Sequence, residues 1–166
     1  PKSIPSDAYA QIAEITQSTG AKLVVDAEKD LVNTVLKYQP LFIKPNKDEL
    51  EEMFDMTVES DQDVVKYGRE ILKEGAQSVI ISLGGDGAIY IDKARSIKAQ
   101  NPKGQVVNTV GSGDSTVAGM VAGLESGLSL EDAFQQAVAS GTATAFTEDL
   151  ATIEDIEKIK SQVTIT

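Results

Sequence analysis

The apolar positions of the chain change their spacing several times between its two ends. Stretches with an apolar residue every three or four positions, which are typical of amphipathic helices, alternate with short apolar runs rich in Val and Ile, which are typical of buried strands. The first pattern predicts helices over 6–20, 28–38, 45–54, 61–74, about 113–126, about 130–147 and from Thr152 onward. The second pattern predicts strands over 22–26, 41–44, 78–83, 87–92, 96–100 and 106–107.

Two details of this pattern lead to the fold. In the first helix Ile12 and Ile15 share one face, and Gly20 is a typical stop signal. The strands over 78–83 and 87–92 are separated by Gly-Gly-Asp, which predicts a hairpin and therefore an antiparallel edge. The alternation of strands and helices predicts an α/β fold in which helices cover both faces of a mainly parallel sheet. Ligands bind such sheets at the carboxyl ends of the strands.

Composition narrows the chemistry that is open to the chain. Its 166 residues fit one domain, and 15 basic and 26 acidic residues give a formal net charge of −11. This balance argues against nucleic acid and anionic membrane as partners. The absence of Cys excludes disulfides and thiolate chemistry, and the absence of His removes the commonest general base. Acid–base chemistry must therefore rest on Asp, Glu, Lys or Tyr, and a bound metal on oxygen ligands, as for Mg²⁺.

The ends and the hydropathy of the chain suggest its location. No apolar run reaches the roughly 20 residues of a membrane span, and the polar opening residues do not form a signal peptide. We therefore expect a cytoplasmic protein. The first residue is Pro rather than Met, so we also expect the chain to be part of a longer one.

The stretch Gly111-Ser112-Gly113-Asp114 lies where the pattern places a strand before a helix. It lacks the Lys-Ser/Thr of a P-loop, the third Gly of a Rossmann fingerprint and the flanking residues of a nucleophile elbow. What remains is a glycine turn whose amides can bind an anion at the start of a helix, with a carboxylate beside them. Asp114 could remove a proton from an alcohol that attacks a phosphoryl group, or it could simply complement the helix dipole.

Two further stretches have both a structural and a functional interpretation. Asn46 and Glu49 have the spacing of a capping box, and their oxygens could also organise a hydrated Mg²⁺. Residues 82–87, Ser-Leu-Gly-Gly-Asp-Gly, predict a hairpin turn, and the missing side chains could also let a nucleotide lie against the backbone. All three stretches are expected at the same edge of the sheet.

Four segments of the chain resemble those of the PfkB, or ribokinase-like, carbohydrate kinases, and within that family the bacterial 1-phosphofructokinases. They are IKPNKDELEEMF, SLGGDGA, NTVGSGDSTVAGMVAGL and AVASGTATAFTEDLAT. Such kinases are considerably longer, so the resemblance implies that residues 1–166 are the C-terminal part of a single ribokinase-like kinase domain. The N-terminal half would then hold most sugar contacts and a small β-sheet lid, through which two copies can form a homodimer.

The resemblance also implies a role for each motif residue. Asp114 is expected to be the catalytic base that deprotonates the C6 hydroxyl of the sugar. Asn46 and Glu49 are expected to position Mg²⁺ through water. The expected anion hole for the transferred phosphoryl group is the backbone of Gly111, Ser112 and Gly113, where the family often has Ala in place of Ser112. The expected nucleotide-binding residues are Ser82, Gly84, Gly87, Ala139, Gly141, Lys44 and Thr109.

The function implied by the resemblance is ATP-dependent phosphorylation of a sugar phosphate, from fructose 1-phosphate to fructose 1,6-bisphosphate, with ATP and Mg²⁺ as cofactors. A tagatose-6-phosphate kinase is the alternative within the family, because the residues that distinguish the sugars lie mainly outside this segment. Outside that activity, the chain could be a nucleotide-binding fragment without turnover, or an α/β scaffold whose glycines only form turns.

Overall fold

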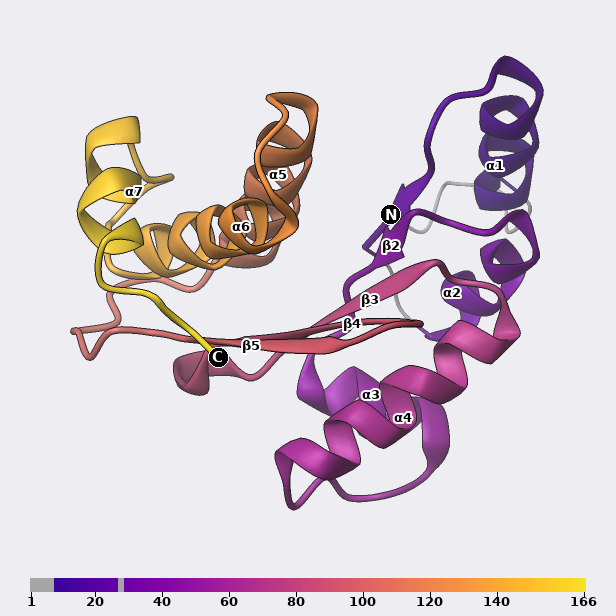
Figure 1. Cartoon of the computed structure of the whole chain (residues 1–166), viewed down its shortest axis with the longest axis horizontal. Coiled ribbons are helices and arrows are strands. Elements are labelled where there is room, and N and C mark those ends of the chain that lie inside the picture. The colour runs from indigo at the N-terminus through magenta and orange to yellow at the C-terminus, as the bar shows by residue number, and fades with distance from the viewer. Residues whose placement is uncertain (1–7, 27–28) are drawn as a thin grey trace. The chain divides into compact units, whose positions relative to one another are not determined.

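The computed structural model describes residues 8–26 and 29–166 (Figure 1). Its helices are α1 (Ala8–Thr19), α2 (Lys29–Val35), α3 (Lys47–Phe54), α4 (Asp61–Glu74), α5 (Ser112–Glu125), α6 (Leu130–Ala145) and α7 (Ile153–Lys160). Its strands are β1 (Val24–Val25), β2 (Phe42–Ile43), β3 (Ser78–Ser82), β4 (Ala88–Asp92), β5 (Ser96–Gln100) and β6 (Thr164–Ile165). Two short 3-10 helices are η1 (Leu36–Tyr38) and η2 (Gly84–Asp86). None of the helices formed by these residues is long and apolar enough to cross a membrane.

The strands of the described residues form one mixed sheet in the order β1–β2–β3–β4–β5–β6. β1 and β2 pair in parallel, with Val24 opposite Phe42, and β2 and β3 also pair in parallel. β5 and β6 pair in the antiparallel direction. The predicted α/β fold class is therefore confirmed, whereas β6 is a strand that the sequence pattern did not predict.

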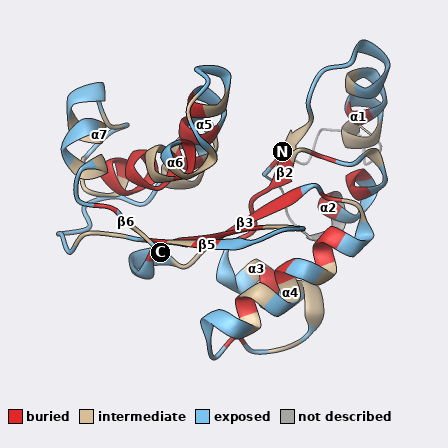
Figure 2. Ribbon diagram, in the orientation of Figure 1, coloured by how far each residue is buried: buried red, intermediate tan, exposed pale blue. Residues whose placement is uncertain are grey.

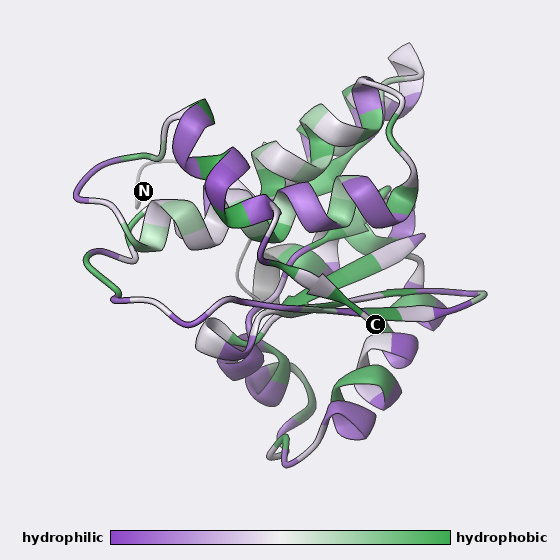
Figure 3. Ribbon diagram, turned by 60° about the vertical axis from the view of Figure 1, so that its left-hand side comes forward, coloured by the Kyte–Doolittle hydropathy of each residue, from purple (hydrophilic) through white to green (hydrophobic). Residues whose placement is uncertain are grey.

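The chain forms two compact units, and the described residues of the first are 8–26, 29–82 and 91–96. Within it, α3 and α4 both contact β3. Leu50 of α3 and Ile71 of α4 are fully buried. Gly68 allows α4 to approach closely, because a Cβ there would collide with the side chain of Ile91. In Figure 3 the helices carry hydrophobic and hydrophilic residues on different sides, as this burial requires.

The second unit comprises residues 83–90 and 97–166. In it, α5 packs against α6, and α6 packs against α7. α6 is buried along most of its length, with every residue from Ala137 to Thr144 buried (Figure 2). The contact between α5 and α6 is close because a Cβ on Gly123 of α5 would lie 2.9 Å from the Cα of Ala133 in α6.

The structure departs from the hydropathy pattern in two places. Ile12 and Ile15 share a face of α1, but that face is exposed, and the buried residue of the helix is Ala13. The predicted strand at Val106 and Val107 is wrong. Both side chains are about half exposed in an irregular segment, where the N–H of Val107 donates to the carbonyl of Ala145 at 2.8 Å. A loop rather than a strand therefore leads into α5.

Candidate active site

The first turns of α3 to α7 follow a common pattern, because each has an acidic residue three positions after its N-cap. In four of these helices the N-cap side chain accepts a hydrogen bond from the amide of that acid. The carboxylate of the acid in turn accepts a hydrogen bond from the N-cap residue. The four pairs are Asn46–Glu49, Ser60–Asp63, Ser129–Asp132 and Thr152–Asp155.

The first turn of α5 is different, because its N-cap is Gly111, which has a φ of 81° and no side chain to accept a hydrogen bond. The N–H of Ser112 donates to the carbonyl of Thr109 at 3.2 Å, and the N–H of Ser115 donates to the carbonyl of Gly111 at 2.8 Å. Gly113 and Asp114 lie between these two residues, and their N–H groups have no acceptor among the described residues. These two donors lie at the positive end of the helix dipole, which is the arrangement that binds anions.

Asp114 is the acid at the third position of α5. Its side chain is exposed and forms no hydrogen bond or ion pair with any residue that the structure describes. The carboxylate that the other four helices use to cap themselves is thus available in α5. An unpaired carboxylate beside two amide donors can accept a proton from a group that the donors help to bind.

Ser112 contributes a second feature to the same turn. Its carbonyl accepts a hydrogen bond from Oγ1 of Thr116 at 2.9 Å. Its own Oγ is buried and has no hydrogen-bond partner among the residues described. A buried hydroxyl without a partner is unfavourable by about 1–3 kcal/mol, so a bound group that paired with it would be favoured.

Helix α6 fixes the position of this turn within the second unit. Oγ1 of Thr144 donates to Oγ of Ser115 at 2.9 Å. A Cβ on Gly141 would collide with Thr116 and lie 2.9 Å from the carbonyl oxygen of Ser112, so only glycine allows this approach. Gly141 and Ala139, which were predicted to bind the nucleotide, are both buried in α6. Packing accounts for their small size, and the contact with the nucleotide stays a prediction.

In the first unit, the ends of the parallel strands bring several predicted residues together. Asn46 forms a β-bridge with Ser82, whose N–H donates to the carbonyl of Pro45 at 3.1 Å. Lys44 is only 6% exposed, and its Nζ lies 3.2 Å from Oδ2 of Asp26. A buried ammonium group requires such a partner. Asp26 was not among the predicted site residues, although its place at the end of a predicted strand was a usable signal.

Asn46 and Glu49 form the predicted capping box of α3. The N–H of Glu49 donates to Oδ1 of Asn46 at 2.9 Å, and the N–H of Asn46 donates to Oε2 of Glu49 at 2.8 Å. The oxygens of both side chains keep lone pairs that can still accept hydrogen bonds from metal-bound waters. Over residues 8–26 and 29–166, no group of three or more Asp or Glu side chains is arranged to hold a metal directly. The pair therefore fits a hydrated Mg²⁺ better than a fully protein-coordinated ion.

The predicted glycine turn belongs to the second unit, apart from Ser82. The N–H of Leu83 donates to the carbonyl of Gly87 at 2.8 Å, which closes η2. Gly87 has a φ of 95°, and a Cβ there would collide with the carbonyl of Ala99, so packing requires this glycine. Gly84 is different, because nothing lies within 4 Å of a Cβ built on it. Open space beside Gly84 is compatible with the predicted nucleotide contact.

Asn101 holds this turn against α6, and sequence reasoning did not find it. Its Nδ2 donates to the carbonyl of Gly84 at 3.0 Å, and its Oδ1 accepts from Oγ1 of Thr142 at 2.8 Å. The second unit therefore links the turn to α6, and α6 to the first turn of α5. Thr109, predicted to reach a phosphate, is exposed just before that turn.

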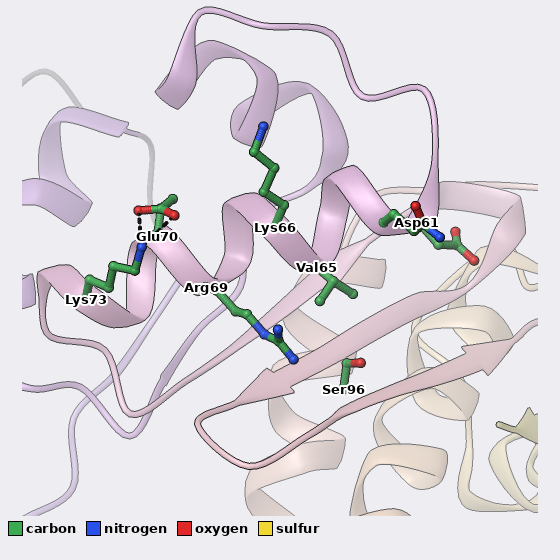
Figure 4. Close-up of a pocket in the computed structure, with 8 residues that line it drawn as sticks. Asp61, Val65, Lys66, Arg69, Glu70, Lys73 and Ser96 are labelled. Carbon is green, nitrogen blue, oxygen red and sulfur yellow. Dashed lines mark hydrogen bonds and ion pairs between the residues drawn. The ribbon is translucent and has the colours of Figure 1, made fainter.

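A cavity of about 520 Å³ lies along α4 in the first unit (Figure 4). Its charges are of both signs, and Nζ of Lys73 pairs with Oε1 of Glu70 at 2.8 Å. Its lining residues are Asp61, Gln62, Val65, Lys66, Arg69, Glu70, Lys73 and Ser96. None of the predicted site residues lines it, so this groove is separate from the candidate active site.

Comparison with known proteins shows what the chain is similar to. The family model for the pfkB family carbohydrate kinases matches residues 1–157. The chain is 40% identical over 166 residues to a 1-phosphofructokinase of Bacillus subtilis, and the match covers 100% of the chain and 55% of that protein. It is 37% identical over 167 residues to a D-tagatose-1-phosphate kinase of Bacillus licheniformis, with 100% and 55% covered.

The fold is also similar to that of a candidate phosphofructokinase from Staphylococcus aureus, whose crystal structure is known. The TM-score is 0.96 and the identity 78%, over 100% of this chain and 54% of that one. The chain thus spans about half the length of the relatives that it matches. The family resemblance predicted from the sequence is confirmed.

Proposed function

Because the chain belongs to the pfkB family of carbohydrate kinases, we propose that the protein that carries it is an ATP-dependent sugar-phosphate kinase. We assign to it the transfer of the γ-phosphoryl group of ATP to the C6 hydroxyl of fructose 1-phosphate, which yields fructose 1,6-bisphosphate and ADP. The similarity to a 1-phosphofructokinase supports this substrate.

The start of α5 is the observation that carries the proposal. It is the one first turn among α3 to α7 in which the N-cap has no side-chain acceptor and the acid at the third position is unpaired. Two free amides and a free carboxylate within three residues are what a phosphoryl transfer to an alcohol requires. The amides bind the anionic group, and the carboxylate takes the proton.

The transfer step follows from this geometry. Asp114 accepts the proton of the C6 hydroxyl as the hydroxyl oxygen bonds to the γ-phosphorus, and the bond between that phosphorus and the bridging oxygen of ADP breaks. The negative charge on the oxygens of the moving phosphoryl group faces the N–H groups of Gly113 and Asp114. The helix holds these donors in position beforehand, so they need little reorganisation during the reaction.

The metal and the nucleotide are assigned to the remaining predicted residues. When bound with ATP, Mg²⁺ would neutralise charge on the phosphates. Asn46 and Glu49 would hold it through water, and Lys44 would contact a phosphate. The residues proposed to contact the rest of the nucleotide are Ser82, Gly84, Gly87, Thr109, Ala139 and Gly141.

A kinase of tagatose phosphates remains the second candidate. The similarity to a D-tagatose-1-phosphate kinase favours a 1-phosphate over the 6-phosphate considered from the sequence alone. Chemistry points the same way, because a sugar 6-phosphate has no free C6 hydroxyl for Asp114 to deprotonate. A nucleotide-binding segment without turnover of its own is the alternative outside the sugar kinases.

The test uses an enzyme of full length. The segment of the Staphylococcus aureus protein that lies outside the match is joined to the N-terminus of this chain, and ADP formation is measured with four acceptors. The acceptors are fructose 1-phosphate, D-tagatose 1-phosphate, fructose 6-phosphate and tagatose 6-phosphate. We expect the highest kcat/KM with fructose 1-phosphate, and ³¹P NMR should identify the product as the 1,6-bisphosphate.

Each other result has a definite meaning. A preference for D-tagatose 1-phosphate would replace the substrate but keep the mechanism. A preference for either 6-phosphate would contradict the assignment of C6 as the acceptor. Calorimetric binding of ATP and Mg²⁺ to this chain, without turnover in the fusion, would support the nucleotide-binding alternative.

A further inference from the structure

Leu150 lies beside the N-cap of α5 without being part of the core. Its side chain is 63% exposed, yet its Cδ2 would be only 2.9 Å from a Cβ built on Gly111. It therefore covers part of the glycine turn at which the proposed phosphoryl transfer takes place. Among the other exposed apolar side chains of the same unit, Val110 and Ile153 are the most exposed, at 78% and 76%.

The backbone on both sides of Leu150 is held in place. Before it, the carbonyl of Glu148 accepts a hydrogen bond from Nδ2 of Asn108 at 3.3 Å. After it, the N–H of Ala151 donates to Oγ1 of Thr144 at 3.3 Å, and that hydroxyl donates to Ser115 in the first turn of α5. The N–H of Leu150 itself donates to Oδ1 of Asp149 at 2.8 Å. The position of Leu150 over Gly111 is thus fixed by hydrogen bonds to both neighbouring segments.

Because most of the Leu150 side chain is in contact with water, it contributes little to the stability of the folded chain through burial. Each Å² of apolar surface removed from water contributes about 25 cal/mol. A bound group that covered the exposed part of Leu150 would therefore be stabilised. The neighbouring Gly113 and Asp114 amides are the groups proposed to receive the phosphoryl group. Because these amides lie within three residues of Gly111, which Leu150 partly covers, a substrate bound there would lie near Leu150.

We propose that Leu150 is a positioning residue that covers the first turn of α5 and keeps water away from the moving phosphoryl group. The inference rests on the proposed function. Excluding water strengthens the attraction between the amides and the phosphoryl oxygens. It also prevents the competing reaction, in which a water oxygen bonds to the γ-phosphorus, the bond to ADP breaks, and inorganic phosphate and a proton are released.

The test compares three variants of the full-length fusion described above. Leu150→Ala removes the cover, Leu150→Met restores an apolar side chain of similar volume, and Ile153→Ala is the matched control. Ile153 is an exposed apolar residue of the same unit, and none of its atoms lies within 4 Å of a Cβ built on Gly111. Two quantities are measured, the kcat for sugar phosphorylation and the number of ATP molecules consumed per sugar phosphorylated.

We expect Leu150→Ala to lower kcat by about 10-fold to 100-fold, the range for a displaced catalytic geometry, and to raise ATP consumption per sugar above one. Leu150→Met should restore both values, and Ile153→Ala should change neither. A lower melting temperature with an unchanged ATP-to-sugar ratio would overturn the inference, because a purely structural role would have that effect. Loss of the proposed function is distinguishable, since the unmodified fusion would then fail to phosphorylate any sugar.

Discussion

The starts of α3 and α5 have the same acidic position and use it in opposite ways. In α3, Glu49 accepts a hydrogen bond from the N–H of Asn46 at 2.8 Å, and Asn46 accepts one from the N–H of Glu49 at 2.9 Å. In α5, the corresponding residues are Asp114 and Gly111; Gly111 has no side chain, and the carboxylate of Asp114 takes no part in a cap. In α3 the N-cap thus occupies the amide of the acid, whereas in α5 the amide of Asp114 is left for a ligand.

The start of α3 therefore stabilises its helix, whereas the start of α5 can bind a ligand. A capping box stabilises its helix by about 1 kcal/mol and engages its polar groups. A glycine N-cap leaves the amides accessible, so contacts from another part of the chain must keep the turn in place. Here they come from α6, through the contact of Gly141 with Thr116 and the hydrogen bond from Thr144 to Ser115.

The same chemical change at the two helix starts should have very different effects, and Asp114→Asn should have the largest. The amide keeps the shape of the side chain but cannot accept the proton. We expect kcat of the full-length fusion to fall by at least about 100-fold, the lower end for loss of a general base. The Kd of ATP, measured by calorimetry, should change by less than about threefold, because ground-state binding is retained. Unchanged turnover would contradict the role of Asp114 as base.

Gly141→Ala tests whether α6 replaces the missing cap. The new methyl group would collide with Thr116, so we expect the free energy of unfolding to fall by about 1–3 kcal/mol. Urea unfolding monitored by circular dichroism measures this loss. Gly85→Ala is the control in the same unit, because nothing lies within 4 Å of a Cβ at Gly85. Equal stability of the two variants would show that α5 does not depend on this contact.

Glu49→Gln separates the cap of α3 from its proposed metal role. Gln still forms a capping box, so the free energy of unfolding should change by no more than about 1 kcal/mol, the value of a charge near a helix start. If Glu49 also orients waters around Mg²⁺, the Mg²⁺ concentration for half-maximal activity should rise about 10-fold, as for other groups that support a metal indirectly. An unchanged Mg²⁺ requirement would leave Glu49 with the capping role alone.

The smallest effect concerns the cap of α7, where the acid is engaged as in α3. The hydrogen bonds from Thr152, first of all that from its hydroxyl, hold the pKa of Asp155 below its ordinary value. The ionised carboxylate thus favours the folded state above the ordinary pKa of an Asp side chain, and this contribution is lost as the pH falls through the lowered value. Melting temperatures should therefore fall less steeply between about pH 6 and about pH 3 in Asp155→Asn and Thr152→Ala. An unchanged slope in both variants would contradict the assignment.

Sequence patterns predicted local structure well where one residue type has one physical role. The cap spacing of Asn46 and Glu49 predicted a capping box that the structure confirms. The stop at Gly20 is also confirmed, since this glycine has a φ of 73° just after α1. The strand predicted at Val106 and Val107 is wrong, because β-branched residues favour strands only where their side chains pack on a neighbouring strand, and these two are about half exposed. In the structure the N–H of Val107 bonds to Ala145 at the end of α6 instead.

The motif residues of the candidate site were predictable, whereas the residues that hold them were not. Asp114 and its glycines stand out in the sequence, because a glycine turn before a helix with an acid in its first turn is a recognisable pattern. Asn101, Thr144 and Leu150 act through single contacts with residues distant in the sequence. No spacing rule links such positions, so only the folded chain shows them.

Binding of the phosphoryl group by the free amides of α5 can be followed by NMR in the ¹⁵N-labelled chain. A non-hydrolysable ATP analogue and ADP are added in turn with Mg²⁺, and the backbone signals at the starts of α5 and α7 are compared. We expect the signals of Gly113 and Asp114 to shift with the analogue and much less with ADP, while the capped amide of Asp155 stays in place. Equal shifts at both helices, or none at α5, would contradict this role of the α5 amides.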